Sequence, residues 1–297
     1  MKMRKKITIC QNCYSKKVEL FFKFSKNYSL YECSDCSFIF TFPQPKETKQ
    51  INQKIYDSRE ELESRIANFP TEYQRAKEHV LKFKKYKKSG RYLDVGCSYG
   101  IGLKAAKDLG FDVLGVEPTK KAAEYAKKHF KVRVIQKTLE NAKIKASSFD
   151  VVSLYDVLEH IPNPNKFLQE IKRILKPHGL LIIQSPNIES VAFKLLRTNW
   201  NWLLVPNHLW HFSRESISNL LNKNGFETKK FLTSDNIYDF SSNLKSKIFN
   251  YKVPKTFIEK SFQKLVYMFF YGTIYMGSKL WIHAGKGGAF QVYAEKK

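Results

Sequence analysis

The pattern of apolar and polar positions changes near residue 90, where short apolar runs begin to alternate with stretches of helical periodicity. Apolar runs predict strands at 91–95, 112–116, 132–136, 149–154 and 179–184, and the periodic stretches predict helices at 101–109, 119–129 and 164–175. Further along, a helix at 214–224 is predicted to end at Gly225, before strands at 226–232 and 289–295. Strict alternation of this kind is typical of an α/β fold in which a parallel sheet carries helices on both faces.

Two regions of different character precede the alternating part. Residues 1–45 contain short aromatic, β-prone runs between two cysteine pairs, and residues 46–90 read as helical. A chain of 297 residues fits one large domain, or a main domain with a smaller one. We expect a small domain at 1–45, a helical linker or cap at 46–90 and a main domain at 91–297. The main domain is expected to carry a hydrophobic insertion at about 234–287.

The small domain has the cysteine spacing of a zinc ribbon. Cys10 and Cys13 form one C-x-x-C pair, and Cys33 and Cys36 form a second one farther along. Each such turn presents two thiolates on one side, and two turns give the tetrahedral four-sulfur set that Zn²⁺ accepts. Because all four positions are filled, we expect a closed, structural site; a redox pair or incidental cysteines are the alternatives. Metal binding would contribute folding free energy to so small a unit.

The main domain begins with the sequence pattern of a nucleoside-binding unit. This pattern consists of a strand, a glycine-rich turn, a helix and a second strand that ends in an acidic residue. The turn lies in YLDVGCSYG at 92–100, and Glu117 ends the apolar run VLGVEP. A carboxylate at the tip of the second strand can accept both ribose hydroxyls. The glycines, Gly96, Gly100 and Gly102, are spaced G-x-x-x-G-x-G rather than as in the dinucleotide motif. This spacing favours a ligand without phosphate, such as S-adenosylmethionine (SAM).

These segments resemble the motifs of class I SAM-dependent methyltransferases, which have a Rossmann-like sheet. The matching segments, in order, are DVGCSYG at 94–100, VEPT at 116–119, FDVVSLYDVLEHI at 149–161 and LKPHGLLIIQSPN at 175–187. A further segment at 208–226 is similar to the block after the fifth strand in a large bacterial branch that includes sugar- and polysaccharide-pathway enzymes. The resemblance covers about 90–233 and, more loosely, the last strand. Ser98 stands where the family usually has the middle glycine of its first motif.

The resemblance implies a set of SAM-contacting residues: Asp94, Gly96, Cys97, Ser98, Gly100, Glu117, Pro118, Leu139, Glu140, Tyr155 and Asp156. In the family, the position of Asp94 orders the glycine turn and the methionine amino group, and that of Glu117 binds the ribose. Leu139 and Glu140 follow the third strand, where the family holds the adenine, although Glu140 could equally face solvent. Cys97 is expected to be a small buried residue rather than a nucleophile.

Two histidines compete as the general base that a hydroxyl acceptor needs. His160 follows a glutamate in the EHI segment, and its alternative role is structural. His208 lies in PNHLWHFS, which resembles the histidine segment of zinc-binding sugar C-methyltransferases, except that Asn207 replaces their glutamate. The missing carboxylate disfavours proton abstraction from carbon and leaves hydroxyl deprotonation, since an imidazole titrates near pH ~6.5. His211 is expected to be structural.

The resemblance therefore implies a SAM-dependent methyltransferase whose small-molecule acceptor is a hydroxyl of a sugar or glycoconjugate precursor. One alternative is an RNA methyltransferase that uses the zinc ribbon and a basic surface. Against it, the exit of the fourth strand reads YDVL and lacks the Asn/Asp-Pro-Pro-aromatic turn that grips an exocyclic amine. Another alternative is a non-catalytic scaffold at a membrane surface. Intact Asp94, Gly96 and Glu117 disfavour it.

The charge of the chain is consistent with an anionic partner but does not favour nucleic acid. The formal net charge is +25, and 43 of the 52 basic residues are lysines, whereas base and phosphate recognition favours arginine. A solvated lysine-rich surface accounts for this composition, with attraction to anionic substrates or a membrane face as the alternatives. The N-terminal residues lack the long apolar run of a secretory signal, and the paired cysteines fit a reducing compartment. We therefore expect a cytoplasmic protein, either free or peripheral at the membrane.

One long apolar stretch remains to be explained. Residues 265–282 contain a single charge, at Lys279, which raises the question of a membrane span. A crossing would prevent the last strand from returning to the sheet, so we expect another use for this stretch. The alternatives are a buried lid, contact with an anionic membrane surface, or a homodimer contact, the last two through 257–282.

Overall fold

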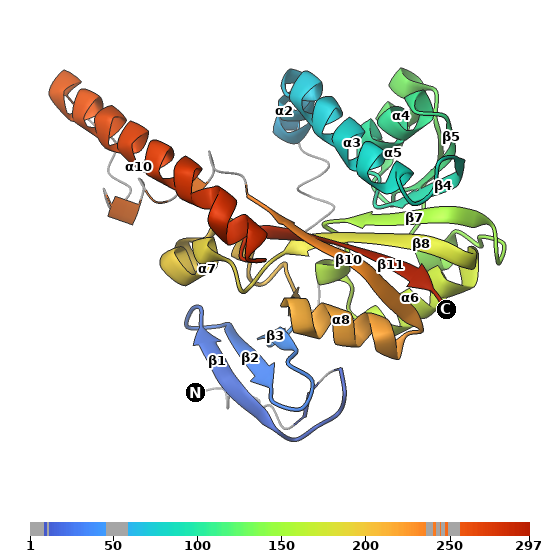
Figure 1. Ribbon diagram of the computed structural model, residues 1–297, viewed down its shortest axis with the longest axis horizontal. Helices are drawn as coiled ribbons and strands as arrows, with labels where there is room; N and C mark the ends of the chain where they lie inside the picture. The colour runs from blue at the N-terminus through green and yellow to red at the C-terminus, as the bar shows by residue number, and fades with distance from the viewer. Residues whose placement is uncertain are drawn as a thin grey trace. The chain divides into compact units, whose positions relative to one another are not determined.

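The computed structural model describes residues 9–10, 12–45, 59–235, 240–241, 244, 247–248 and 256–297. The chain divides into two compact units (Figure 1). The sheet unit comprises Gln44–Gln184, Ser218–Lys230 and Val292–Lys297. The ribbon unit comprises Met1–Pro43, Ser185–Ile217 and Phe231–Gln291.

The seven-stranded sheet has the order β10-β11-β8-β7-β4-β5-β6. Its strands are β4 (Gly90–Val95), β5 (Phe111–Val116), β6 (Arg133–Ile135), β7 (Phe149–Tyr155), β8 (Leu175–Pro186), β10 (Phe226–Ser234) and β11 (Ala289–Lys296). Four adjacent pairs, from β6 through β5, β4 and β7 to β8, are parallel. The predicted fold class is confirmed: this is a Rossmann-like sheet that is mostly parallel.

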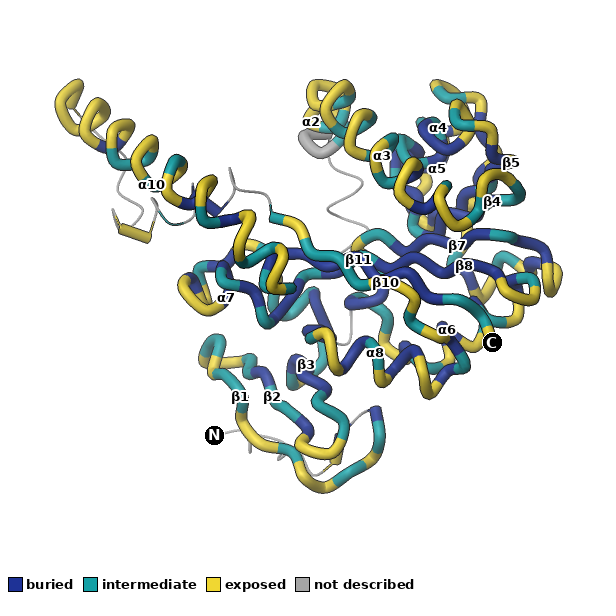
Figure 2. The backbone as a smooth tube through the Cα atoms, in the orientation of Figure 1, coloured by how far each residue is buried: buried dark blue, intermediate teal, exposed yellow. Residues whose placement is uncertain are grey.

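Helices cover both faces of this sheet. Helices α3 (Phe69–Lys84), α4 (Ile101–Asp108) and α5 (Lys120–Phe130) lie on one face, and α6 (Pro164–Ile174) lies on the other (Figure 1). Because both faces are covered, β7 is buried along almost its whole length and β8 is buried from Gly179 to Ile183 (Figure 2). Helix α6 shows how the sequence produces this arrangement. Asn163 caps its first turn by accepting from the amide of Lys166 at 3.0 Å, and Phe167, Leu168 and Ile171 form its buried stripe.

Strand order creates a crevice at one edge of the sheet. The chain leaves β4 toward β5 and β6 and then returns to β7 on the other side of β4. Loops that follow the carboxyl ends of β4 and β7 therefore diverge, which leaves room for a ligand between them. The short helices η1 (Leu139–Asn141) and η2 (Leu158–His160) follow β6 and β7 at this edge.

The ribbon unit contains a four-stranded antiparallel sheet whose last strand comes from a distant part of the chain. Its order is β1 (Val18–Lys23), β2 (Ser29–Cys33), β3 (Ile39–Phe42) and β9 (Trp210–His211). Ile39 pairs with His211, and Phe40 pairs with Trp210. The segment that the sequence places after the fifth strand of the main sheet is thus part of the cysteine-containing unit.

A hydrophobic core holds the ribbon unit together. Side chains from β2 and β3 pack with α7 (Val191–Leu196), with the segment around Trp200 and Leu203, and with Ile274 of the long helix α10 (Phe257–His283). Other helices among the described residues include α2 (Arg59–Ala67), α8 (Arg214–Lys223), η3 (Arg197–Asn199) and η4 (Asn201–Leu203). No helix in the described ranges is long and apolar enough to cross a membrane.

The three domain boundaries proposed from the sequence, at 1–45, 46–90 and 91–297, stay predictions. Within the second region, α2 and α3 are helical as expected, whereas residues 46–58 lie outside the described ranges. The expected insertion at about 234–287 corresponds to the chain between β10 and β11 and includes α10.

Candidate active site

The turn after β4 requires glycine at its first position. Gly96 has φ +74°, and a Cβ there would lie 2.6 Å from Cγ2 of Val157. Its amide donates to the carbonyl of Val116 at 2.7 Å, which ties the turn to β5. The left-handed backbone and the close side chain together exclude a larger residue. The peptide backbone therefore lines the crevice directly at this point.

Glu117, at the carboxyl end of β5, holds the next part of the turn. Its carboxylate accepts from the amides of Ser98, at 2.9 Å, and Thr119, at 2.8 Å, and the residue is buried. Ser98 adopts φ +48°, so the serine occupies the left-handed conformation in which the family usually has glycine. The Ser98 Oγ atom is buried and makes no hydrogen bond with the described residues. A buried polar atom of this kind fits a site that receives a polar ligand.

Asp94, at the end of β4, is a buried carboxylic acid. Its Oδ1 atom accepts from Ser153 Oγ at 2.6 Å, and that hydroxyl lies 2.6 Å from the hydroxyl of Tyr92. Burial raises the pKa of Asp94 to about 7; the hydrogen bond from Ser153 opposes this shift and the nearby Glu117 adds to it. A cationic group placed beside Asp94 would therefore find a carboxylate that is readily ionised near neutral pH.

Two cavities adjoin at this edge of the sheet. One has a volume of about 240 Å³ and the other about 390 Å³, and Gly96, Tyr155 and Asp156 line both. The smaller is also lined by Asp94, Cys97 and Ser98, and the larger by Glu117, Pro118, Leu139, Glu140 and His160. The structure thus brings together all the predicted SAM-contacting residues except Gly100. Leu139 is buried and Glu140 is exposed.

Gly100 and Cys97 have clear packing roles. A Cβ at Gly100, which has φ +81°, would lie 2.6 Å from the Cβ of Ala126 on α5. A Cβ at Gly115 on β5 would lie 2.5 Å from the Cys97 sulfur, so the thiol fills a space that β5 leaves open. Burial also raises the pKa of Cys97 well above its usual range, which agrees with an unreactive buried thiol.

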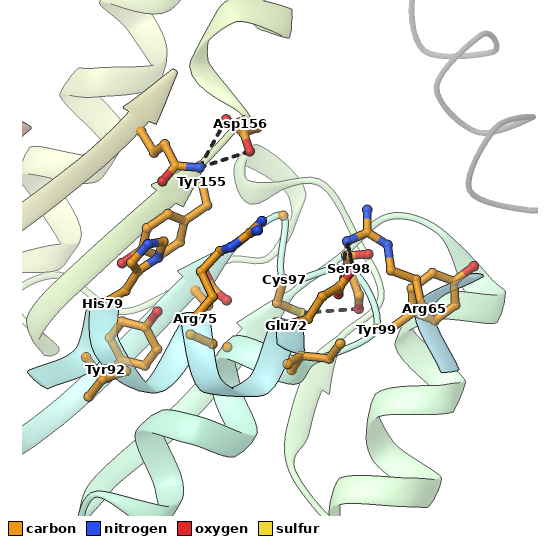
Figure 3. Close-up of a pocket in the computed structure, with 17 residues that line it drawn as sticks. Arg65, Glu72, Arg75, His79, Tyr92, Cys97, Ser98, Tyr99, Tyr155 and Asp156 are labelled. Carbon is orange, nitrogen blue, oxygen red and sulfur yellow. Dashed lines mark hydrogen bonds and ion pairs between the residues drawn. The ribbon is translucent and has the colours of Figure 1, made fainter. Parts of the chain in front are cut away.

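Helices α2 and α3 contribute residues to the smaller cavity that the sequence analysis missed (Figure 3). The Nη1 atom of Arg65 donates to both carboxylate oxygens of Glu72, at 3.0 and 3.1 Å, and Arg75 also lines the cavity. The sequence pattern of residues 46–90 predicts helix, but it does not reveal which polar side chains reach the cavity. The helical cap therefore places positive charge near the carboxyl end of β4.

His79 on α3 is a second missed residue. Its ring stacks on Tyr155 with a centroid distance of 5.2 Å and an interplanar angle of 16°. Burial lowers the pKa of His79 to about 4, and the nearby Lys82 and Arg75 contribute to the shift, so the ring is neutral at pH 7. The Tyr155 hydroxyl is buried and makes no hydrogen bond with described residues. This pair forms an aromatic wall of the cavity with an available hydroxyl.

The two candidate bases belong to different units. His160 lies in η2 and lines the larger cavity of the sheet unit. His208 lies in the ribbon unit, where its carbonyl accepts from Thr41 Oγ1 at 2.7 Å. The neighbouring His211 has its Nε2 atom 2.9 Å from the same hydroxyl, and burial lowers its pKa to about 3, as suits a structural histidine. The catalytic roles of His160 and His208 stay predictions.

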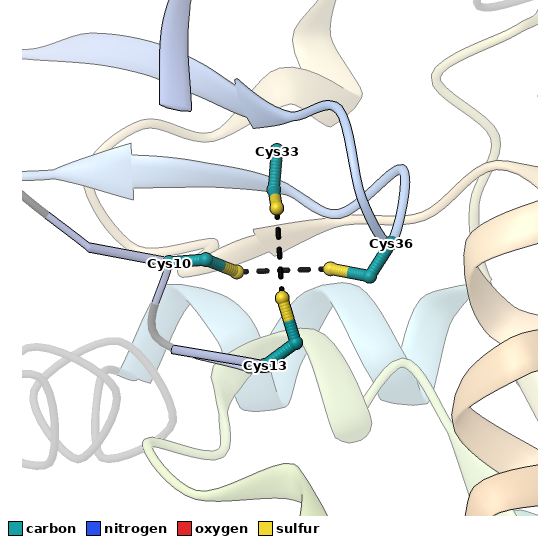
Figure 4. Close-up of side chains that lie close together, drawn as sticks. All are labelled: Cys10, Cys13, Cys33 and Cys36. Atoms are coloured by element: carbon teal, nitrogen blue, oxygen red, sulfur yellow. Dashed lines mark hydrogen bonds between the residues drawn. The ribbon is translucent and has the colours of Figure 1, made fainter. Parts of the chain in front are cut away.

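The four cysteines of the ribbon unit converge on one point (Figure 4). The sulfur atoms of Cys10 and Cys36 are 3.7 Å apart, those of Cys13 and Cys33 are 3.6 Å apart, and all four lie within 4.8 Å of one another. A tetrahedral zinc ion with Zn–S bonds of about 2.3 Å separates its sulfurs by roughly 3.8 Å, so the geometry fits this metal. No disulfide joins these cysteines.

Comparisons with known proteins agree with this geometry. The family model described as a methyltransferase domain matches residues 66–230. The ubiquinone biosynthesis O-methyltransferase of Haemophilus ducreyi is 33% identical over 124 residues, which are 38% of this chain and 52% of that protein. The protein of the same name from Pelagibacter ubique is 28% identical over 182 residues, 56% of this chain and 76% of that protein. The chain spans about half the length of the first of these curated relatives.

Solved structures show the same fold. A SAM-dependent methyltransferase from Thermotoga maritima aligns with a TM-score of 0.54 and 21% identity, covering 84% of this chain and all of the other (100%). A geranyl diphosphate methyltransferase in complex with SAM aligns with a TM-score of 0.51 and 12% identity, covering 76% of this chain and 85% of that chain. The family model covers more than half of the sequence. This chain therefore belongs to the methyltransferase-domain family and is a class I SAM-dependent methyltransferase.

Proposed function

We propose that this enzyme methylates a hydroxyl group of a small-molecule acceptor. The observation that carries the proposal is the pair of adjoining cavities at the carboxyl ends of β4, β5 and β7, which share Tyr155 and Asp156. The larger cavity, lined by Glu117 and Leu139, can take the nucleoside of SAM. The smaller cavity, lined by Asp94 and Ser98, leaves room for the methionine part and an acceptor. When bound, SAM supplies an electrophilic methyl group, and the protein must orient the acceptor and receive its proton.

The residues present fit SAM, and each end of the cofactor has a matching group. Glu117 suits the ribose hydroxyls, because it is a buried carboxylate already oriented by two backbone amides. Asp94 and the unpartnered Ser98 hydroxyl suit the amino end of the methionine. Arg75 of the helical cap suits its carboxylate. Leu139 gives the larger cavity a buried apolar wall for the adenine.

The second part of the proposal concerns the chemical class of the molecule that accepts the methyl group. The segment PNHLWHFS favours a sugar or a glycoconjugate precursor, through its resemblance to sugar methyltransferases. The relatives are ubiquinone biosynthesis O-methyltransferases, and by analogy a quinone precursor favours an aromatic hydroxyl as the acceptor. Both acceptors undergo the same reaction at oxygen, and both need a base for the hydroxyl proton. We propose the sugar hydroxyl as the acceptor and treat the aromatic hydroxyl as the second candidate.

The test is turnover of SAM against two panels of acceptors, nucleotide sugars and catechol-type phenols. His208→Ala and His160→Ala are then compared on the best acceptor, with His129→Ala as a matched control, because His129 is exposed on α5 and lines neither cavity. Loss of the general base is expected to reduce turnover by roughly 10²–10⁴-fold and to leave SAM affinity nearly unchanged. If both variants keep full turnover, the proposed base is wrong; if neither panel is methylated, the acceptor class is wrong.

We also propose that Cys10, Cys13, Cys33 and Cys36 hold a structural zinc ion. The support is the sulfur geometry together with the buried or half-buried position of all four residues. Each pair lies within a tight turn, closed by the amide of Tyr14 donating to the Cys10 carbonyl and by that of Ser37 donating to the Cys33 carbonyl. Four protein ligands leave no open coordination position, so the ion would contribute stability rather than chemistry.

A further inference from the structure

Three buried side chains of the sheet unit form a short network of hydrogen bonds beside the smaller cavity. Ser153 Oγ donates to Asp94 Oδ1 at 2.6 Å, and the hydroxyl of Tyr92 lies 2.6 Å from the same Oγ atom. All three residues are buried. Hydrogen bonds between such groups are strong, because the effective dielectric constant around them is low. We call Tyr92, Ser153 and Asp94 the hydroxyl network.

The pairing of the strands brings these three residues together. Tyr92 and Asp94 are two positions apart on β4, so their side chains point to the same face of the sheet. Ser153 is the direct partner of Asp94 in the parallel pairing of β4 with β7. Its neighbours along β7, Val152 and Leu154, are buried and apolar, so the serine is a polar exception in a hydrophobic strand. A buried hydroxyl costs free energy unless it forms a hydrogen bond, which indicates a role for this one.

Packing fixes the direction of the Tyr92 hydroxyl. The ring stacks on Phe83 of α3 with a centroid distance of 5.4 Å and an interplanar angle of 21°, and the ring of Phe111 on β5 lies 6.2 Å away. Both phenylalanines are buried. Figure 3 shows Tyr92 among the residues that line the smaller cavity. Because the ring is held by its neighbours, the donor is already oriented toward Ser153 before any ligand binds.

The number of hydrogens in the hydroxyl network matches an ionised Asp94. Two contacts join the three oxygen atoms, and each contact needs one hydrogen. The serine hydrogen points to Asp94, so the hydrogen of Tyr92 occupies the other contact. Burial raises the pKa of Tyr92 well above its usual range, so this hydrogen stays in place. A protonated Asp94 would add a third hydrogen that the two contacts cannot use, so the network favours the charged carboxylate.

The groups nearest to Asp94 oppose its ionisation, and Ser153 counteracts them. Burial raises the pKa of Asp94 to about 7; the hydrogen bond from Ser153 lowers it, and the nearby Glu117 on β5 raises it further. Helix α4 approaches Asp94 through Gly102, where a Cβ would lie 3.0 Å from Oδ2, so it brings no charge at this point. The bond from Ser153 is therefore what keeps the carboxyl ionisable near neutral pH.

Other titratable groups around the cavity differ in charge. Burial raises the pKa values of Cys97, in the turn after β4, and of Tyr155, on β7, well above their usual ranges, so both are neutral at pH 7. Helices α2 and α3 line the cavity with Arg65, Glu72, Arg75 and His79. Arg65 and Glu72 form an ion pair, and His79 is neutral at pH 7 because burial lowers its pKa to about 4.

We propose that Tyr92 and Ser153 are positioning residues that act through Asp94. Their hydroxyls hold its carboxylate charged and fixed in direction, in the form that the amino group of the cofactor requires. The proposal rests on the proposed function only for the placement of this amino group beside Asp94. Loss of either hydroxyl should therefore change how the affinity for SAM depends on pH.

The test measures the SAM affinity of the full-length protein by calorimetry between pH 6 and pH 8. Ser153→Ala removes the donor to the carboxylate, so the midpoint of the rise in affinity should move up by about one pH unit. Affinity should fall about tenfold at pH 6 and only about twofold at pH 8, whereas a merely structural defect lowers it equally at both. Tyr92→Phe should give about half this shift. Ser153→Thr, which keeps the hydroxyl, should restore the wild-type midpoint.

Ser148→Ala is the matched control. Ser148 is a buried serine of the same unit that lines neither cavity, and its hydroxyl donates to the carbonyl of Ala146 at 3.3 Å. This variant should keep the affinity of the wild-type protein at every pH. Circular dichroism confirms that each variant is folded, and Tyr92→Phe carries the test if Ser153→Ala does not fold.

A second measurement separates the hydroxyl network from the placement of the cofactor. NMR of isotope-labelled aspartate carboxyls follows the titration of Asp94 without SAM, and Asp94→Asn identifies the signal. We expect the titration of Asp94 to move to higher pH in Ser153→Ala and Tyr92→Phe. A titration that is the same in both variants as in the wild type overturns the proposal. A shifted titration together with a SAM affinity that does not vary with pH supports the network and contradicts the proposed placement of the amino group.

Discussion

At the scale of single residues, Glu117 links the glycine turn to the proposed ribose site. Its carboxylate receives two amides, from Ser98 and Thr119, and still lines the larger cavity. The same residue therefore has a structural role in the unliganded protein and a proposed binding role toward SAM. A substitution here should affect both the shape of the turn and the affinity for the cofactor.

Glu117→Ala is expected to weaken SAM binding by roughly 1–3 kcal/mol, because charge-assisted hydrogen bonds are lost and two amides are left unpaired. Isothermal calorimetry with the purified protein measures the change. Glu124→Ala is the matched control, since Glu124 is an exposed acid on α5 that lines neither cavity. Unchanged affinity in Glu117→Ala would remove this residue from the site.

The raised pKa of Asp94 predicts a pH dependence of SAM binding. Its pKa is about 7 in the folded protein because the carboxyl is buried, so the group is largely protonated at pH 6 and ionised at pH 8. The amino group of the cofactor favours the ionised form. SAM affinity is therefore expected to rise by about tenfold between pH 6 and pH 8 and then to level off. Asp94→Asn should bind SAM weakly, with no such rise.

The raised pKa of Asp94 has the opposite effect on the stability of the protein without SAM: stability falls as pH rises. The pKa of Asp94 is raised above the unfolded value of 3.8, so its contribution is fully present below about pH 4 and is lost as pH rises toward 7. The unliganded protein should lose stability across this window, and Asp94→Asn should lose less. Thermal unfolding at several pH values, with and without SAM, separates the two effects; parallel curves for the two proteins would contradict the assignment.

Residues that belong to local motifs were predictable, and those that depend on tertiary contacts were not. Gly96 and Glu117 could be found because a strand, a tight turn and a second strand place them by chain connectivity alone. Arg75 and His79 lie on a helix whose pattern reveals its apolar face but not the cavity that its polar side chains reach. Ser98 was recognised as a departure, yet its left-handed backbone could only be seen in the fold.

At the scale of elements, the alternating strands and helices were predicted to within about two residues, because the hydrophobic period determines them. The exception is β8, which begins at Leu175, four residues before the predicted strand at 179–184. The pairing of β9 with β3 was not predicted. Two residues, Trp210 and His211, join a strand that lies far earlier in the chain. A strand this short leaves almost no periodic signal, and its partner depends on the packing of the whole ribbon unit.

The zinc ribbon leads to a prediction about metal content. Protein prepared without added metal should contain one zinc ion per chain, and a strong chelator should lower its melting temperature, because the ion links two turns of a small unit. Cys33→Ser should lose the ion, whereas Cys97→Ser, which changes the fifth cysteine in the sheet unit, should keep it. Elemental analysis gives the result. Less than about a tenth of an equivalent in a folded wild-type protein would rule out a structural zinc site.

At the scale of the whole molecule, the net charge of +25 invites comparison with enzymes that act on nucleic acid. Lysines outnumber arginines by 43 to 9, which is typical of general attraction to anionic surfaces and not of base recognition. Many exposed aromatic and aliphatic residues gather instead on one helix, α10. The composition of the basic residues therefore disfavours the RNA alternative.

This reasoning predicts weak, non-specific RNA binding and no methylation of RNA. Binding of RNA should fall steeply between 50 mM and 200 mM salt, because lysine–phosphate contacts release counterions and few base contacts replace them; a loss of roughly 10³-fold is expected if about six phosphates are engaged. Incubation of total RNA with radiolabelled SAM should transfer no label, whereas binding of SAM itself persists at both salt concentrations, since the buried groups around Glu117 and Asp94 are little screened. A salt-resistant RNA complex, or label transferred to RNA, would favour the nucleic-acid alternative and would assign the zinc ribbon to RNA recognition.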